Sequence, residues 1–288
     1  MPKKTNSWLN DAMTAPKQIA VVIIPTYNRV GLLSRAVESV RGQSFSDFEL
    51  IIINDASTDD TKNFLDDLAK KDSRVRPIHN EKNNYPDVSG TRNKALSLAH
   101  GAYIAPLDDD DYWCDPKKLE KQIAFLDVHP ECVIAGGGTI VINESDHERF
   151  RYMKLETDMA IRNRILIANP FTHSTVMFRR DVSLAVGGYG NFKNAEDWDL
   201  WLKLGTKGEF YNFHEYFVRY LMNEQSKTVI FKRSQTKEIF TLLRLYRHQY
   251  PNFWSAYALN FGQYCFSALP HSLQKALYTG LSRAKRNL

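Results

Sequence analysis

The chain has few cysteines and no long apolar segment, and each absence excludes a class of protein. Its 288 residues include three cysteines, Cys114, Cys132 and Cys265, too few and too far apart for a disulfide framework or a zinc-ligand pattern. We therefore expect a reducing compartment, the cytoplasm. No run reaches the ~20 consecutive apolar residues of a membrane-spanning helix. Residues 1–17 are polar and lack the apolar core of a signal peptide.

Strong net charge is also absent, but the charge is unevenly distributed. The whole chain carries +5, of which residues 232–288 carry +8 from nine Lys/Arg and one Glu, so the first 231 residues carry −3. A basic segment beside a nearly neutral body suggests an anionic surface as its partner, most often a membrane or nucleic acid. A solvated helix face is the alternative, and charge alone leaves both open.

The first half of the chain alternates apolar β-type runs with helical patterns, which predicts βαβ units and a mostly parallel sheet. Several runs are continuous, as strands buried on both faces require. The predicted strands are 19–24, 48–53, 75–79, 102–107 and 132–135, with helices that include 90–99 and 117–128. The first strand is expected to stop at Pro25, and the glycines 136–138 to follow the fifth.

The second half is harder to interpret. Residues 143–164 are polar and match no pattern. Residues 172–178 favour a strand and 196–204 a short helix, and after about residue 232 the chain becomes helical, aromatic and basic. We predict an α/β fold with a Rossmann-like, mostly parallel sheet flanked by helices, and a helical extension at the C-terminal end.

Four consecutive carboxylates, Asp108–Asp111, follow the predicted strand 102–107. Adjacent carboxylates repel one another, so the run is unfavourable unless water or a cation neutralises it. Mg²⁺ and Mn²⁺ bind carboxylate oxygens and often bridge to substrate phosphates. A solvated acidic turn is the alternative. The position after a buried strand, next to Tyr112 and Trp113, favours a metal and diphosphate site.

Other polar side chains follow strands at the edge where open α/β sheets bind ligands. Tyr27, in Pro-Thr-Tyr-Asn-Arg after the first strand, could stack on a base or line the turn. Asp55, after the second strand, could recognise a base edge or ribose hydroxyl, or cap a helix. Arg92, at the start of a predicted helix, suits a phosphate or a surface ion pair.

Glu196 and Asp197 open the predicted helix 196–204. Carboxylates at this end of a helix are often only favourable partners of the helix dipole. One of them could instead be a general base that accepts a proton from a hydroxyl nucleophile. Their spacing alone does not decide between these roles.

Taken together, these segments resemble the inverting glycosyltransferases of family 2, which have the GT-A fold. The matching stretches are 21–29, 52–59, 91–96, 103–113 and 196–201, in the family's order over about residues 18–220. The resemblance implies a hexosyltransferase of bacterial surface-polysaccharide type. It would move a sugar from a nucleotide-diphosphate donor, expected to be UDP-linked, to a hydroxyl of a glycan or lipid-linked glycan.

The resemblance also implies a role for each matching residue. The implied donor-binding residues are Thr26, Tyr27, Arg29, Asp55, Arg92, Asp108 and Asp109. The acidic run contains the family's DXD motif, with Asp110 and Asp108 expected to hold Mn²⁺ or Mg²⁺. Asp109 stands where a small residue is common, so the division of ligands within the run stays open. The family often has a glycine soon after the third strand, where this chain has Asn83 to Asp87, so we expect that loop to have its own shape.

On the acceptor side, the resemblance implies that Asp197 is the catalytic base and that Glu196 lies beside it in the acceptor site. His173 falls where relatives often carry a histidine. It is expected either near the donor phosphates or acceptor, or in a structural role.

On this interpretation the chain has an N-terminal extension (1–17), a catalytic domain (18–231) and a basic aromatic helical extension (232–288). The catalytic domain divides into a nucleotide-binding half, 18–115, and an acceptor half, 116–231. After Pro270, apolar residues fall on one helical face and Lys/Arg mostly on the other, as in a helix that lies in a membrane interface. The expected partner is the anionic inner face of the cell membrane; packing on the body or on a second subunit is the alternative.

Two rival functions are less consistent with the residues, and we expect no nucleic-acid partner. A sugar-nucleotide pyrophosphorylase would have a Gly-rich loop after the first strand, where this chain has residues 25–29. A non-catalytic nucleotide- or membrane-binding module would explain the basic segment but not five ordered motifs.

Overall fold

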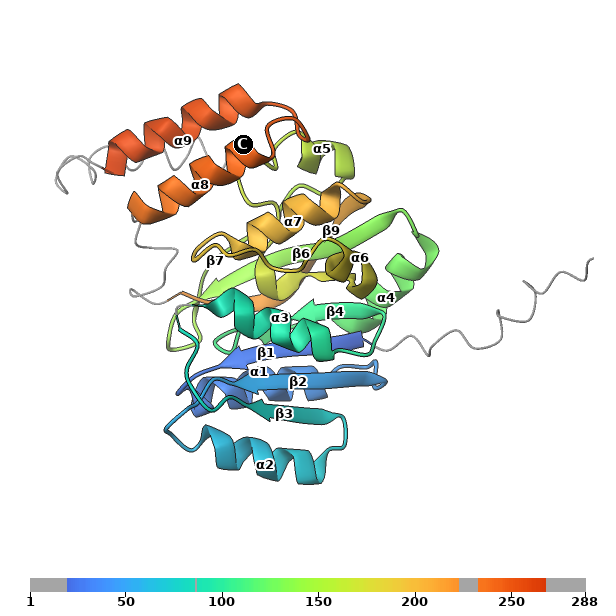
Figure 1. Ribbon diagram of the computed structural model, residues 1–288. Helices are drawn as coiled ribbons and strands as arrows, with labels where there is room; N and C mark the ends of the chain where they lie inside the picture. Colours follow the sequence, from blue (N-terminus) through green and yellow to red (C-terminus); the bar gives the residue numbers. More distant parts are fainter. Residues whose placement is uncertain (1–19, 86, 223–232, 268–288) are drawn as a thin grey trace, which may run out of the picture.

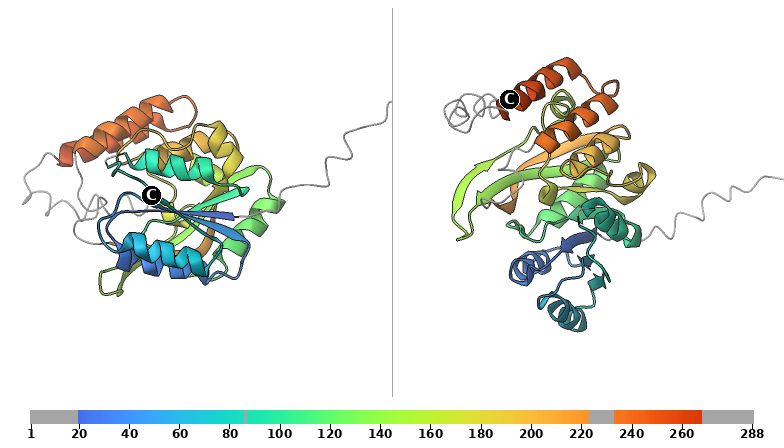
Figure 2. Two further views of the ribbon diagram at one scale, coloured as in Figure 1. Left: turned by 60° about the horizontal axis from the view of Figure 1, so that its bottom comes forward. Right: turned by 60° about the vertical axis from the view of Figure 1, so that its left-hand side comes forward.

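The computed structural model describes residues 20–85, 87–222 and 233–267. These residues form one nine-stranded sheet with helices on both of its faces (Figures 1 and 2). The predicted α/β fold with a mostly parallel sheet is confirmed. The N-terminal extension 1–17 and the amphipathic pattern after Pro270 lie outside the described residues.

The first four strands are parallel and lie in the order β3-β2-β1-β4. They are β1 (Ala20–Thr26), β2 (Phe48–Asn54), β3 (Val75–His79) and β4 (Tyr103–Pro106), joined by the helices α1 (Val30–Arg41), α2 (Thr61–Lys71) and α3 (Val88–Leu98). The apolar side chains of β1 and β2 are buried because helices cover both faces of the sheet. β1 does not stop at Pro25 as predicted but continues to Thr26, which pairs with Asn54.

The rest of the sheet combines short antiparallel ladders with one long parallel ladder, between β6 and β9. Its strands are β5 (Tyr112–Trp113), β6 (Cys132–Ile142), β7 (Glu148–Tyr152), β8 (Met177–Arg179) and β9 (Glu209–Leu221). The helices of this half are α4 (Lys118–Val128), α5 (Asp158–Arg162), α6 (Arg180–Ala185) and α7 (Glu196–Gly205). The predicted helix 196–204 is confirmed as α7.

Two predictions for this half were wrong. The strand predicted at 132–135 continues to Ile142, so the three glycines lie inside β6 and not after it. The strand predicted at 172–178 is a 3₁₀ turn, His173–Thr175, followed by β8. This turn places His173 and Ser174 beside the acidic run rather than in the sheet.

The helices α8 (Arg233–Leu245) and α9 (Phe253–Ser267) stack on the side of the molecule that carries α7, at the far end from α2 (Figure 1). The Tyr246 hydroxyl donates to Asp199 Oδ1 at 2.9 Å and the Tyr250 hydroxyl to the Leu202 carbonyl at 2.7 Å, and both acceptors belong to α7. The predicted domain boundary at residue 231 stays a prediction. Among the described residues, none of the helices combines the length and the hydropathy needed to cross a bilayer.

Candidate active site

The loops that follow β1 and β4 are joined by hydrogen bonds at the carboxyl edge of the sheet. The Thr26 hydroxyl donates to Asp109 Oδ2 at 2.8 Å. Arg29 Nη1 donates to Asp109 Oδ1 and to Asp110 Oδ2, at 3.0 Å each. The structure therefore brings together four of the predicted donor and metal residues, because parallel strands end at one edge of the sheet.

Asp55 lies at the same edge, after β2, in a cluster of amides. Its carboxylate accepts from the Asn80 amide at 2.7 Å and from the backbone and side-chain nitrogens of Asn84 at 2.9 and 3.0 Å. The loop that departs from the family pattern thus closes over Asp55. Ala56 next to it has a φ of 60°, which is rare for a residue other than glycine and marks strained backbone. Tyr27 is 45% exposed and can be reached by a ligand.

Arg92 connects the two halves of the predicted site. It is 8% exposed; its Nη2 donates to Asp108 Oδ1 at 2.8 Å and its Nη1 to Glu196 Oε1 at 2.6 Å. His173 Nδ1 lies 3.2 Å from Asp108 Oδ1, and His173 Nε2 lies 3.0 Å from the Tyr189 hydroxyl. Burial alone would raise the pKa of Asp108, but His173 and Arg92 hold that pKa well below its ordinary value.

The other members of the acidic run have raised pKa values. Burial, with Asp108 and Asp109 nearby, raises the pKa of Asp110 to about 6, against the opposing charge of Arg29. Burial also raises the pKa of Asp109 and, further, that of Asp111. Asp111 is 1% exposed and accepts from the Ser174 hydroxyl at 2.6 Å and the Leu221 backbone N–H at 3.1 Å. Asp111 therefore ties the run to β9, and Asp110 is left on the open side.

The donor set of the acidic run fits a divalent ion of the Mg²⁺ or Mn²⁺ class. Two crowded carboxylates, Asp109 and Asp110, share one arginine, Arg29, and the Asp110 side chain is 29% exposed at the open side of the cluster. Within the described residues there is no preformed cluster of three or more His, Cys, Asp or Glu ligands. Ions of this class commonly take one or two carboxylates and complete their shell with water and substrate phosphates, so no such cluster is required.

Asp197, in the first turn of α7, is supported by two residues that the sequence did not indicate, Asn169 directly and Lys154 through Asn169. The Asn169 amide donates to Asp197 Oδ2 at 2.8 Å, and Lys154 Nζ donates to the Asn169 carbonyl at 3.1 Å. Burial and the adjacent Glu196 raise the pKa of Asp197, while burial lowers the pKa of Lys154 despite the nearby Asp197. Neither Asn169 nor Lys154 lies in one of the five stretches that match the family, so no local signal could have identified them.

Comparison with known proteins places the chain among sugar transferases. A family model described as Glycosyl transferase family 2 matches residues 21–187. The protein EpsE of Bacillus subtilis, named as a glycosyltransferase, is 33% identical over 231 residues, which cover 78% of this chain and 80% of EpsE. The Escherichia coli protein WfaP, named UDP-Glc:alpha-D-GlcNAc-diphosphoundecaprenol beta-1,3-glucosyltransferase, is 41% identical over 111 residues, 38% of this chain and 42% of WfaP.

Solved structures share the fold at low sequence identity. S. aureus TarS 1–349 in complex with UDP-GlcNAc superposes with a TM-score of 0.62 at 21% identity, over 79% of this chain and 65% of that chain. The mannosyltransferase PcManGT of Pyrobaculum calidifontis, in complex with GDP-Man and Mn²⁺, superposes with a TM-score of 0.63 at 15% identity, over 96% and 86%. At these identities the likeness shows the GT-A fold.

Proposed function

The chain belongs to glycosyltransferase family 2, and from this premise we propose that it is a metal-dependent, inverting enzyme that uses a UDP-linked sugar and a glycan or lipid-linked glycan acceptor. One observation carries the proposal. Arg92 contacts Asp108 at one end and Glu196 at the other, so the acidic run and the carboxylates of α7 lie at one site. A site with these two halves suits a reaction between two substrates.

On the donor side, Thr26, Tyr27 and Asp55 are proposed to hold the base, and Arg29 and Arg92 to face the diphosphate. The amides that close over Asp55 fix the orientation of its carboxylate. Asp110, with Asp108 as the second expected ligand, would hold a divalent ion, which would supply Lewis-acid stabilisation of the leaving nucleotide diphosphate. Asp108 itself is held ionised by Arg92 and His173, which keeps an anion at the boundary between donor and acceptor.

On the acceptor side, Asp197 is proposed to take the proton from the attacking hydroxyl in a single displacement, which inverts the anomeric carbon. Its raised pKa brings it closer to the pH at which a general base works best. Asn169 is a positioning residue, because its amide donates to one carboxylate oxygen and limits rotation of the side chain. Glu196, engaged by Arg92, remains beside the acceptor.

The names of the relatives support the substrate class. WfaP is named for UDP-Glc and a diphosphoundecaprenol-linked sugar, and the TarS structure contains UDP-GlcNAc. A lipid-linked acceptor would require contact with a membrane, proposed at its inner face, and we keep residues 232–288 as the proposed contact. Association of the chain into a homo-oligomer also stays a proposal. The PcManGT complex contains GDP-Man and Mn²⁺, so a test of the donor must compare UDP-linked sugars with a GDP-linked sugar.

A donor-binding experiment tests the donor and metal parts of the proposal. Calorimetric titration with UDP-glucose, UDP-GlcNAc and GDP-mannose, each with Mn²⁺, with Mg²⁺ and with chelator, should give binding of a UDP-sugar only with a metal. Asp110→Ala should remove the metal dependence of donor binding. The control variant Asp181→Asn, which changes an exposed carboxylate on α6, should not alter that dependence. Donor affinity that never depends on metal would overturn this part.

A kinetic experiment tests the assignment of the base. Asp197→Asn should lower kcat by about 10²–10⁴-fold and leave donor affinity nearly unchanged, because the base acts on the acceptor. Release of nucleotide diphosphate measures turnover, and NMR of the product anomeric proton tests inversion. Unchanged turnover in the variant, or retention at the anomeric carbon, would contradict the mechanism.

A further inference from the structure

The pair of C-terminal helices has an outer surface that the transfer reaction does not use. The turn after α8 is bonded to α7 through Tyr246 and Tyr250, and Leu242 and Leu243 of α8 are buried. α9 lies on the outside, so that one of its faces is directed away from the body (Figures 1 and 2). This arrangement leaves α9 as the outermost element at that end of the molecule.

The polarity of α9 is the reverse of that of a helix facing water. Phe253–Ser267 contains no charged residue. Trp254 is 78% exposed, Phe261 52% and Leu259 40%, whereas Asn260 is 1% exposed and donates to the Ala256 carbonyl within the helix. A helix at the surface of a soluble domain normally turns charged residues outward, and a contiguous exposed apolar patch marks an interaction surface.

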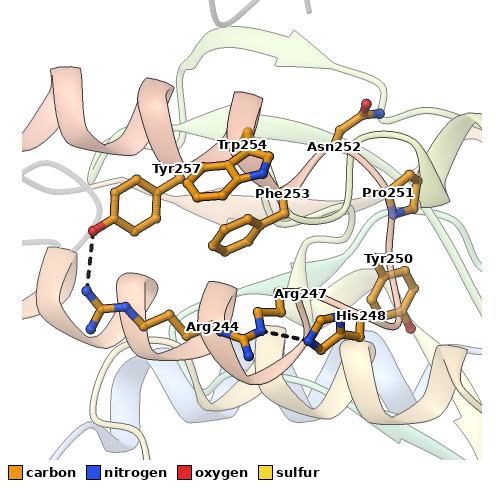
Figure 3. A pocket seen from close by; sticks show the side chains of 9 residues that line it. All are labelled: Arg244, Arg247, His248, Tyr250, Pro251, Asn252, Phe253, Trp254 and Tyr257. Atoms are coloured by element: carbon orange, nitrogen blue, oxygen red, sulfur yellow. Dashed lines mark hydrogen bonds between the residues drawn. The ribbon is translucent and has the colours of Figure 1, made fainter.

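A basic groove lies beside this apolar face, between α8 and α9. Its volume is about 730 Å³. Arg244 lines it from α8 and Arg247 from the turn after α8, while Phe253, Trp254 and Tyr257 line it from α9 (Figure 3). Arg244 Nη2 donates to the Tyr257 hydroxyl at 3.3 Å and Arg247 Nε to His248 Nε2 at 2.8 Å. Within the described part of the chain, neither arginine is paired with a carboxylate, so both retain donors for an external anion.

We propose that this surface docks the protein on an anionic phospholipid bilayer. Headgroup phosphates bind Arg244 and Arg247 in the groove, and Trp254, Leu259 and Phe261 lie among the headgroups and upper acyl chains. Tryptophan and tyrosine concentrate at membrane interfaces, and arginines near the surface are attracted by anionic lipids. A helix with an uncharged outer face beside basic residues is suited to the plane of the interface.

A second copy of the chain is the other occupant to consider, and the charges disfavour it. A two-fold symmetric interface would bring the same patch of each copy together, and with it the arginines of both copies. A bilayer instead supplies the negative charge that the groove lacks. Docking also has a structural consequence. Because the turn between α8 and α9 is bonded to α7, docking fixes the carboxylates at the start of α7 relative to the membrane plane. The inference concerns binding alone and does not depend on the proposed donor or mechanism.

Vesicle flotation of the full chain, without nucleotide sugar, tests the electrostatic part. The vesicles are phosphatidylcholine alone, or phosphatidylcholine with an equal amount of phosphatidylglycerol. The chain should float with the anionic vesicles only, and less so as salt increases. Arg244→Gln with Arg247→Gln should weaken partitioning roughly 25-fold, about fivefold for each arginine. The matched control, Lys71→Gln with Lys207→Gln, removes two exposed cations elsewhere and should change it little.

A second pair of variants tests the apolar face. Trp254→Ser with Phe261→Ser should weaken binding to anionic vesicles on the order of tenfold or more. Val128→Ser with Met159→Ser, which changes two residues exposed to a similar degree elsewhere, should not. All variants should melt within a few degrees of the parent chain, because the changed side chains are exposed. The proposal would be overturned if parent and variants floated equally, or if the chain bound neutral and anionic vesicles equally. It would also be overturned, in favour of a second copy, if the variants changed the mass measured by light scattering and not the flotation.

Discussion

Asp110 is a carboxylate whose surroundings favour its neutral form. Burial and the charges of Asp108 and Asp109 raise its pKa to about 6, and Arg29 compensates only in part. In an unfolded chain the pKa of an aspartate is about 3.9, so the pKa of Asp110 is higher in the folded state. Such a carboxyl contributes stability that is fully present below pH ~4 and is lost as the pH rises through ~6. At neutral pH the substrate-free fold therefore carries an unfavourable charge, as a site built for a cation would.

This linkage predicts that Asp110→Asn stabilises the substrate-free protein. At about pH 8 its free energy of unfolding should exceed that of the parent by about 1–3 kcal/mol, and the difference should vanish near pH 4. Urea unfolding over this pH range, without divalent ions, measures it. Asp181→Asn, which changes a carboxylate 90% exposed, serves as the control and should have little effect at any pH. A variant less stable than the parent at pH 8 would show that Asp110 has a structural role.

Asn169 leads to a prediction about the pH profile of the reaction. Asp197 must be ionised to accept a proton, so kcat should fall on the acid side as the pH drops through its pKa, which lies above the ordinary value. The Asn169 amide stabilises the ionised form, so Asn169→Ala should raise this pKa and move the acid limb to higher pH.

The position of the acid limb distinguishes positioning from structural damage in Asn169→Ala. A general loss of structure would lower kcat by the same factor at every pH and would lower the melting temperature. A shifted limb with a nearly unchanged KM for the donor would support the positioning role. An acid limb at the same pH as in the parent enzyme would rule it out.

At the scale of the elements, strands made of continuous apolar runs could be predicted, whereas a long strand of mixed composition could not. β1 and β2 were found because continuous apolar runs are needed where helices cover both faces of a sheet. β9 was missed because Glu209–Leu221 mixes aromatic with charged and polar residues, which reflects a strand buried unevenly along its length. β6 was shortened because a glycine run normally indicates the end of a strand.

The same reasoning explains which site residues could be predicted. Residues at the ends of parallel strands must meet at one edge, so Thr26, Arg29 and the acidic run could be grouped from order alone. The contact of Asn169 with Asp197 spans 28 residues and depends on how the segment before the 3₁₀ turn packs on α7, which no local pattern encodes. The resemblance to a known family supplied Asp197 but none of its supporting partners.

The glycines inside β6 predict a packing penalty. A methyl group at Gly137 would lie 2.8 Å from Phe217 Cε2 and 3.1 Å from the Glu215 carbonyl oxygen, both on β9. Gly137→Ala should therefore lower the free energy of unfolding by about 1–3 kcal/mol through overpacking. Gly31→Ala on α1, where no atom lies within 4 Å, should instead be neutral or stabilising by up to about 1 kcal/mol. Thermal and urea unfolding measure both; equal effects of the two variants would contradict the close packing of β6 on β9.

At the scale of the whole molecule, α8 and the turn after it share a hydrophobic core with the catalytic body. Leu242, Leu243 and Tyr246 belong to one buried cluster with Trp201 of α7 and Ile134 of β6. A peripheral extension of an independently folded domain would bury little of its own surface against that domain. The packing therefore indicates that the described residues unfold as a single cooperative unit.

This packing predicts one unfolding transition for the full chain. In calorimetry the van't Hoff and calorimetric enthalpies should agree, because the buried side chains of the C-terminal helices belong to a cluster that they share with the catalytic body. Tyr246→Phe removes a hydroxyl donor from Asp199 and should cost about 1.5–3 kcal/mol, moving the whole transition to lower temperature by several degrees. Trp254→Ser on the outer face of α9 should leave the transition in place, since that side chain is 78% exposed. If Tyr246→Phe instead released an early, separate transition while the main one stayed unchanged, the C-terminal helices would be an independent unit, and membrane docking through them could not orient α7.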